Sequence, residues 1–309
     1  MLGRRTLLAA MLGGATTLTA SACARQPNGP SRMPTPLMSP SATPLPGQNA
    51  LTTLVAGLDV ARATAWPTAQ TELIGWAGSV VRDQATEVSL PAPPPLPPAS
   101  EASTSPDEAA VAGLTSALRD AGDAFTAQAA DPSSARPLIW ASMAAWAATT
   151  ADQVDDPQAP REPARSVLTP APQDAHSAVT TSLSTADQAV YGLGVIGGSP
   201  GLTEADRAAL RRRITAWMSV RDALRDAAGP SPAPTPGAPC YDIARPVDRE
   251  AARQAAAALE GAALPILGRS VAYCSADTAA VLANALSGAA RSVARWGGLV
   301  ERWPGLPQR

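Results

Sequence analysis

The sequence predicts an all-α protein. Residues 175–228 contain two series of apolar side chains at alternating spacings of three and four, which is the pattern of one helix face. A glycine and proline turn separates the two series, so this stretch is expected to form two long helices, half of an antiparallel bundle. No long segment alternates between apolar and polar residues as a strand does. Most of the 32 prolines gather in four blocks, at residues 27–46, 91–98, 157–172 and 230–239, which leaves the periodic segments almost free of helix breakers.

The composition is that of a globular chain that does not bind nucleic acid. Of the 309 residues, 45% are hydrophobic and 16% are charged, and the length allows two modest domains. The only dense basic run is residues 211–213, three arginines, and no basic patch is interleaved with aromatic residues. We interpret this run as a solvated helix face with local acidic partners.

Residues 1–23 have the features of an export signal with a lipobox-like end. Arg4 and Arg5 precede an uncharged run and resemble a twin-arginine signal. The sequence Ala-Ser-Ala-Cys at residues 20–23 resembles a bacterial lipobox, which implies that Cys23 is acylated and becomes the mature N-terminus. An ordinary secretory signal cleaved nearby is the alternative. The protein is therefore expected to be exported and lipid-anchored at the outer face of the cell membrane.

The next two segments are a tether and a helical region. Residues 24–48 are rich in proline and serine and almost uncharged, so they are expected to form a semi-extended tether. An N-terminal helical region follows over 49–155, and a proline-rich linker over 156–172 separates it from the C-terminal region, 173–307. Within the N-terminal region, the periodicity and the placement of first-turn prolines predict helices over 51–65, 67–88, 106–128 and 133–154.

The C-terminal region is expected to hold four helices. The second begins at Thr203 with acidic residues in its first turn, as in a capping box. The third covers 247–273 and the fourth begins near Ser275. Several motifs in this region occur in a recognisable order: ADQAVYGLGVIG (186–197), VRDAL (220–224), CYDIARPVD (240–248), AARSVARW (289–296) and WPGLP (303–307).

These motifs resemble the domain of unknown function 4439, a ferritin-like family of actinobacterial envelope proteins. The resemblance covers roughly residues 174–307. It implies a ferritin-like four-helix bundle for the C-terminal region. The N-terminal helical region, which precedes this bundle, is expected from its periodicity alone. The resemblance implies no established activity.

The cysteines predict a disulfide. If Cys23 carries lipid, Cys240 and Cys274 remain, and an even pair in an exported protein is more often bridged than free. A straight helix over 247–273 is about 40 Å long, so the bridge requires a bend at Pro265, a later helix start, or a preceding chain that folds back along the helix.

The sequence offers no catalytic or cofactor site. A ferritin-like metal centre uses two Glu-x-x-His pairs, and this chain has none. The single histidine, His176, lies at a helix start, where we interpret it as a flanking residue. With one histidine no nucleophilic triad is expected, so we predict neither a metal, a cofactor nor an enzyme activity.

One charged residue falls on a predicted core face. Arg221 lies on the apolar stripe of the helix that begins at Thr203, and a buried arginine needs a carboxylate partner. Asp187 on the preceding helix is the best candidate for a buried ion pair. The alternative is that Arg221 extends outward along its apolar stem.

The sequence therefore favours a non-enzymatic lipoprotein with a structural or protein-binding role, whose partners are the membrane and another envelope protein. This role predicts an exposed apolar patch on the N-terminal helices. A carrier of an apolar ligand between helices would instead need an enclosed apolar cavity. An atypical metal-binding protein would need clustered carboxylates in the bundle.

Overall fold

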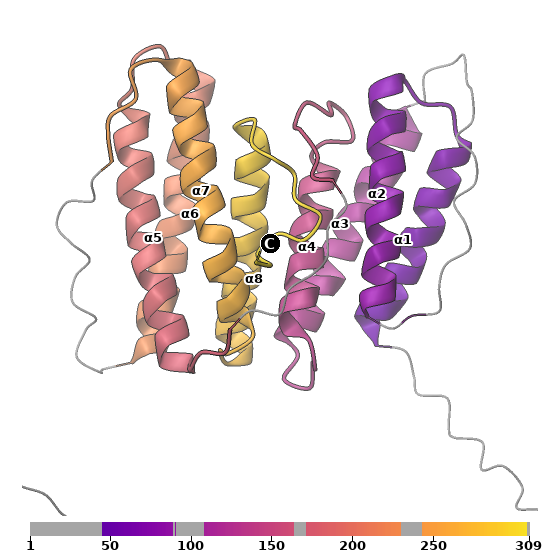
Figure 1. Cartoon of the computed structure of the whole chain (residues 1–309), viewed down its shortest axis with the longest axis horizontal. Coiled ribbons are helices and arrows are strands. Elements are labelled where there is room, and N and C mark those ends of the chain that lie inside the picture. The colour runs from indigo at the N-terminus through magenta and orange to yellow at the C-terminus, as the bar shows by residue number, and fades with distance from the viewer. Residues whose placement is uncertain (1–44, 89, 91–107, 164–170, 230–242, 308–309) are drawn as a thin grey trace, which may run out of the picture. The chain divides into compact units, whose positions relative to one another are not determined.

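The computed structural model describes residues 45–88, 90, 108–163, 171–229 and 243–307. Within these residues it contains eight α-helices and no sheet, which confirms the predicted all-α fold (Figure 1). The helices are α1 (Pro46–Ala63), α2 (Thr68–Glu87), α3 (Glu108–Ala130), α4 (Pro137–Ala151), α5 (Ala175–Gly197), α6 (Glu204–Ala228), α7 (Arg249–Val271) and α8 (Ala276–Arg295).

Most helix boundaries lie within four residues of their predicted positions, and α1 shows the largest difference. It begins at Pro46, inside the stretch expected to be tether, because proline fits the first turn of a helix and leaves no N–H unsatisfied there. Leu51, Leu54 and Leu58 of this helix are buried. The apolar stripe of α1 therefore anchors it to the core.

The last four helices form a bundle with one long crossover. Helix α5 packs on α6 and α7, and α8 packs on the same two helices, so α6 and α7 stand at opposite corners. Short turns join α5 to α6 and α7 to α8. Arg249 bonds to Asp206 near the start of α6 and Glu260 bonds to Arg213 farther along, so α6 and α7 run in the same direction. A four-helix bundle with a single long crossover is the topology of ferritin-like folds.

The predicted capping box at the start of α6 is confirmed. The Thr203 hydroxyl accepts from the Asp206 backbone N–H at 3.1 Å, and the Asp206 carboxylate accepts from the Thr203 N–H at 3.0 Å. Arg249 of α7 also donates to Asp206, and this bond together with those from Thr203 lowers the pKa of Asp206 to about 2 despite its burial. The stability that Asp206 contributes is therefore complete above about pH 4 and is lost as the pH falls through about 2.

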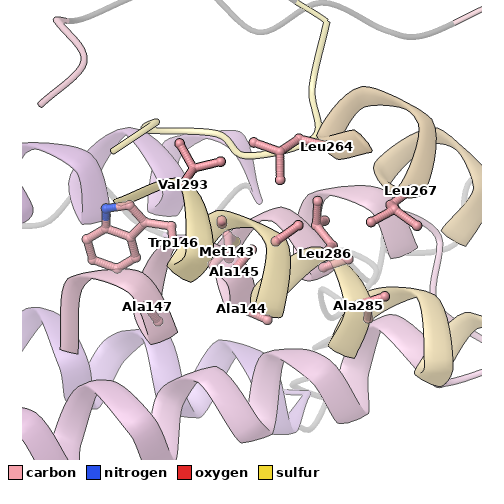
Figure 2. Packing of buried hydrophobic residues seen from close by; sticks show 14 of the residues in the cluster. Met143, Ala144, Ala145, Trp146, Ala147, Leu264, Leu267, Ala285, Leu286 and Val293 are labelled. Carbon is pink, nitrogen blue, oxygen red and sulfur yellow. The ribbon is translucent and has the colours of Figure 1, made fainter. Parts of the chain in front are cut away.

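The N-terminal helices pack on the bundle through α4. Almost every residue of α4 is buried, as expected for a helix covered on all sides. Figure 2 shows Met143 and Trp146 of α4 among Leu286 and Val293 of α8 and Leu264 of α7. These side chains belong to one hydrophobic cluster that runs from α1 to the C-terminal segment, so the two helical regions share a core.

The described part of the expected linker joins the two regions closely. Arg161 forms a parallel bridge with Val300, and the Glu162 carboxylate accepts from the Arg302 backbone N–H at 2.7 Å. After α8 the chain turns back over the bundle, where Trp303 and Leu306 are buried. These bonds attach the C-terminal segment to residues 161–162, which follow the N-terminal helices, and the burial of Trp303 and Leu306 attaches it to the bundle.

Candidate functional site

A buried charged cluster spans the diagonal of the bundle between α6 and α7. The Glu260 side chain is 0% exposed and accepts from Arg213 Nε at 2.6 Å and Nη2 at 2.8 Å. The Trp217 indole N–H lies 3.2 Å from both carboxylate oxygens. The guanidinium carbon of Arg213 is 4.7 Å from the centre of the Trp217 ring. Bidentate geometry and a third donor thus compensate a carboxylate that has no contact with water.

Helix α8 leaves room for this arginine. A Cβ atom at Gly288 would lie 2.7 Å from Nη1 of Arg213, closer than carbon and nitrogen atoms approach. The absence of a side chain at Gly288 therefore lets the guanidinium reach Glu260 past α8.

The residues of the bundle do not fit the di-metal centre of ferritin-like folds. Such a centre needs inward carboxylates from all four helices and two histidines. Asp206 and Glu260 are the only buried acidic residues of the described helices α5 to α8, and an arginine bonds to each. In the part of the chain that the structure describes, no group of three or more His, Cys, Asp or Glu side chains could hold a metal ion. At Glu260 the guanidinium of Arg213 stands where a cation would bind.

The expected contact between Arg221 and Asp187 is not the one that forms. Arg221 pairs with its neighbour Asp222 at 3.0 Å, and Asp187 pairs with Arg225 at 3.2 Å. The inward face of α6 is carried by Leu210, Trp217 and Leu224, all buried. Arg221 lies at the flank of that stripe: its side chain is 19% exposed, and its guanidinium pairs with the exposed carboxylate of Asp222.

The interpretation of residues 211–213 as a solvated face holds for Arg211 and fails for Arg213. Arg211 pairs with the exposed Glu204, whereas the Arg213 side chain is only 12% exposed. A signal for the buried pair was present in the sequence: Glu260 is the only charged residue in the apolar stretch 255–267. A lone carboxylate in such a stretch needs a buried cation.

An apolar groove lies between α1 and α3 on the N-terminal helices. Its volume is about 470 Å³, it is open on one side, and none of the described residues that line it is charged. Val60, at its edge, is 69% exposed. The lining residues are small or apolar: Thr53, Ala56, Gly57, Val60, Ala61, Thr64, Trp66, Ala110, Gly113, Leu114 and Ala117. An exposed apolar surface on these helices is what a protein-binding role predicted.

The remaining predicted site residues fall into two groups. Arg4, Arg5, Cys23 and Cys240 lie outside the described residues. His176 is exposed in the first turn of α5, next to the N-cap Asp174, as expected of a flanking residue.

The predicted disulfide is not formed in the structure. Cys274 is a half-buried free thiol, and its burial raises its pKa. Ile243 and Leu259 both pack over Gly192, so the chain before α7 does run back along the helix, one of the conditions that the bridge required. The Cys240–Cys274 disulfide stays a prediction for the oxidised protein, which a non-reduced digest showing two alkylatable thiols would refute.

Among the comparisons with known proteins, a match was found for the C-terminal part of the chain. Residues 178–308 match the family model described as Domain of unknown function (DUF4439). No curated protein matches the chain. No solved structure matches it either. None of the described helices is long and apolar enough to cross a membrane. The matched residues comprise α5 to α8 and the C-terminal segment almost entirely, so the helical bundle is the part of this chain that is similar to the DUF4439 family.

Proposed function

We propose that this protein is an exported, lipid-anchored envelope protein without enzymatic activity, whose N-terminal helices bind another envelope protein. The observation that supports this proposal is the apolar groove between α1 and α3. Soluble monomers seldom leave contiguous apolar surface uncovered unless it has a binding role. The groove is open and not enclosed, which favours a protein partner over a carried apolar molecule.

The partner that fits the groove is an apolar face of a helix. The groove follows two packed helices, and glycines and alanines form much of its walls. Small residues allow a third helix to approach closely, and the described lining residues carry no charge, which favours an apolar partner surface. Cβ atoms at Gly57 and at Gly113 would meet nothing within 4 Å, so space for the partner's side chains lies above both positions.

A photo-crosslinking experiment tests this groove in the full-length protein in its own cells. A benzoylphenylalanine in place of Val60 is expected to form a discrete product with another protein. The substitution Gly57→Leu fills the groove and should remove that product, while Gly194→Leu on α5, another glycine with open space beside it, should leave it unchanged. The same crosslinker at Val247, which is 79% exposed and far from the groove in sequence, should give no such product.

Other outcomes contradict the proposed partner. A product of twice the mass of the chain would identify a second copy as the occupant. An adduct with a small apolar molecule would favour the carrier hypothesis. Equal products from Val60 and Val247, or a product that survives Gly57→Leu, would show that the groove is not a binding site.

The proposed anchor rests on Cys23. Removal of residues 1–22 deletes Arg4 and Arg5 and no acidic residue, so the mature chain keeps an excess of acids and its net charge does not draw it to anionic lipid. Stable anchoring needs about two acyl chains, which a lipobox cysteine would supply. We expect Cys23→Ser to move the protein from the membrane fraction to the soluble fraction. Retention of the variant on washed membranes would refute the lipid anchor.

A further inference from the structure

An arginine-rich cleft lies where the N-terminal helices meet the bundle of α5 to α8. Its volume is about 650 Å³, and it is lined by α3, the end of α4, α6 and α8. Among the described residues, five arginines line it but only two acidic residues, Asp152 and Asp155. Positive charge therefore predominates in the cleft, although the whole chain carries a formal net charge of −2.

Three of the five arginines have structural partners. Arg213 is bound to Glu260 inside the bundle. Arg291 of α8 bonds to Asp152 through Nε at 2.6 Å and Nη2 at 3.2 Å, and Arg119 of α3 lies 3.8 Å from the same carboxylate. These contacts tie α3 and the end of α4 to α8. They hold the walls of the cleft in place, and the paired carboxylates neutralise most of the charge of these three arginines.

The other two arginines are available to a ligand. Arg212 and Arg295 are exposed, and among the described residues neither forms an ion pair. The guanidinium of Arg295 lies 5.9 Å from the centre of the Trp296 ring, a contact that restricts its orientation. Two guanidinium groups from different helices thus border one cleft, and among the described residues no carboxylate lies within ion-pair distance of either.

Trp296 forms part of the cleft wall beside Arg295. This residue is 4% exposed, so its ring is a fixed surface next to the Arg295 guanidinium.

We propose that this cleft binds a ligand carrying a phosphate or diphosphate group, with Arg212 and Arg295 as its main contacts. The planar guanidinium fork matches phosphate oxygens, and a phosphate monoester carries about −1.5 to −2 charges, enough to balance two arginines, whereas a carboxylate carries one. The volume of the cleft lies within the range of small-molecule sites. The phosphate could belong to a soluble organic phosphate or to a lipid headgroup that ends in a phosphate monoester.

Calorimetric titration of the folded protein with inorganic pyrophosphate tests the soluble source. Binding is expected for the unmodified protein and should weaken as salt is added, because the contacts are charged. The double variant Arg212→Gln, Arg295→Gln should bind at least about tenfold more weakly, since each lost charge-assisted contact costs about that factor. The matched control is Arg211→Gln, the preceding residue on α6, whose side chain pairs with Glu204 and does not line the cleft.

Sedimentation with vesicles tests the lipid source. To remove the proposed lipid anchor, the vesicle test uses the Cys23→Ser protein. Vesicles that contain phosphatidic acid, whose headgroup is a phosphate monoester, should carry down this protein and not its Arg212→Gln, Arg295→Gln form if the ligand is a headgroup. Pure phosphatidylcholine vesicles should carry down neither. The proposal is overturned if neither pyrophosphate at about 1 mM nor the anionic vesicles bind. It is also overturned if Arg211→Gln weakens binding as much as the double variant does. Urea unfolding of both variants verifies that they remain folded.

Discussion

Replacing Glu260 with alanine is expected to lower the free energy of unfolding by about 3–5 kcal/mol. The substitution leaves the Arg213 guanidinium, which is largely buried, without its carboxylate, and leaves the Trp217 N–H without an acceptor. An unpaired charge in the interior cannot recover its lost hydration. Urea unfolding followed by circular dichroism at neutral pH measures the loss.

The matched control is Glu250→Ala on the same helix. Glu250 is exposed and bonds to Gln254 one turn away, so its loss should cost less than about 1 kcal/mol. The double substitution Arg213→Met, Glu260→Leu should recover much of the stability, because apolar residues of similar volume can replace a buried ion pair. A cost for Glu260→Ala no greater than that for Glu250→Ala would mean that the cluster does not stabilise the bundle.

Local sequence signals were sufficient for the helices. The spacing of apolar residues found every helix of the described chain, and Thr203 with Asp206 marked the start of α6 correctly, because capping involves residues only three apart. The start of α1 was missed because a proline-rich composition predicts a tether even where its last residues form the first turn of a helix. The burial of α4 on all sides depends on its neighbours, which periodicity does not specify.

The charged contacts were harder to predict because they depend on the register between helices. Arg221 and Arg213 both lie near the apolar stripe of α6, and only the position of α7 brings Glu260 to one of them. The arginine-rich cleft combines side chains from α3, α6 and α8, which are far apart in the sequence. The groove between α1 and α3 was anticipated only as an apolar patch, since its location depends on how the two helices pack.

The contact between α7 and the C-terminal segment is expected to be sensitive to the addition of a single methyl group at Gly268. A Cβ atom at Gly268 would lie 2.5 Å from the carbonyl oxygen of Gly305 and 2.8 Å from its Cα, so backbone and not a flexible side chain would have to move. Gly305 itself has a φ of +84°, a conformation that side chains disfavour, which limits how the segment can adjust. Gly268→Ala should therefore cost about 2–3 kcal/mol, as overpacking in a core does, and loosen the segment that buries Trp303.

Gly261→Ala, seven residues earlier on the same helix, separates this close contact from the intrinsic effect of the substitution. A Cβ atom there would meet only a Val293 methyl group at 3.9 Å, an ordinary van der Waals distance. Because alanine favours a helix interior over glycine, Gly261→Ala should stabilise the protein by up to about 1 kcal/mol. The free energy of unfolding in urea should thus fall for Gly268→Ala and rise for Gly261→Ala. Limited proteolysis near the C-terminus should become faster only for Gly268→Ala. If both substitutions stabilise the protein, the segment yields to a methyl group and does not pack rigidly on α7.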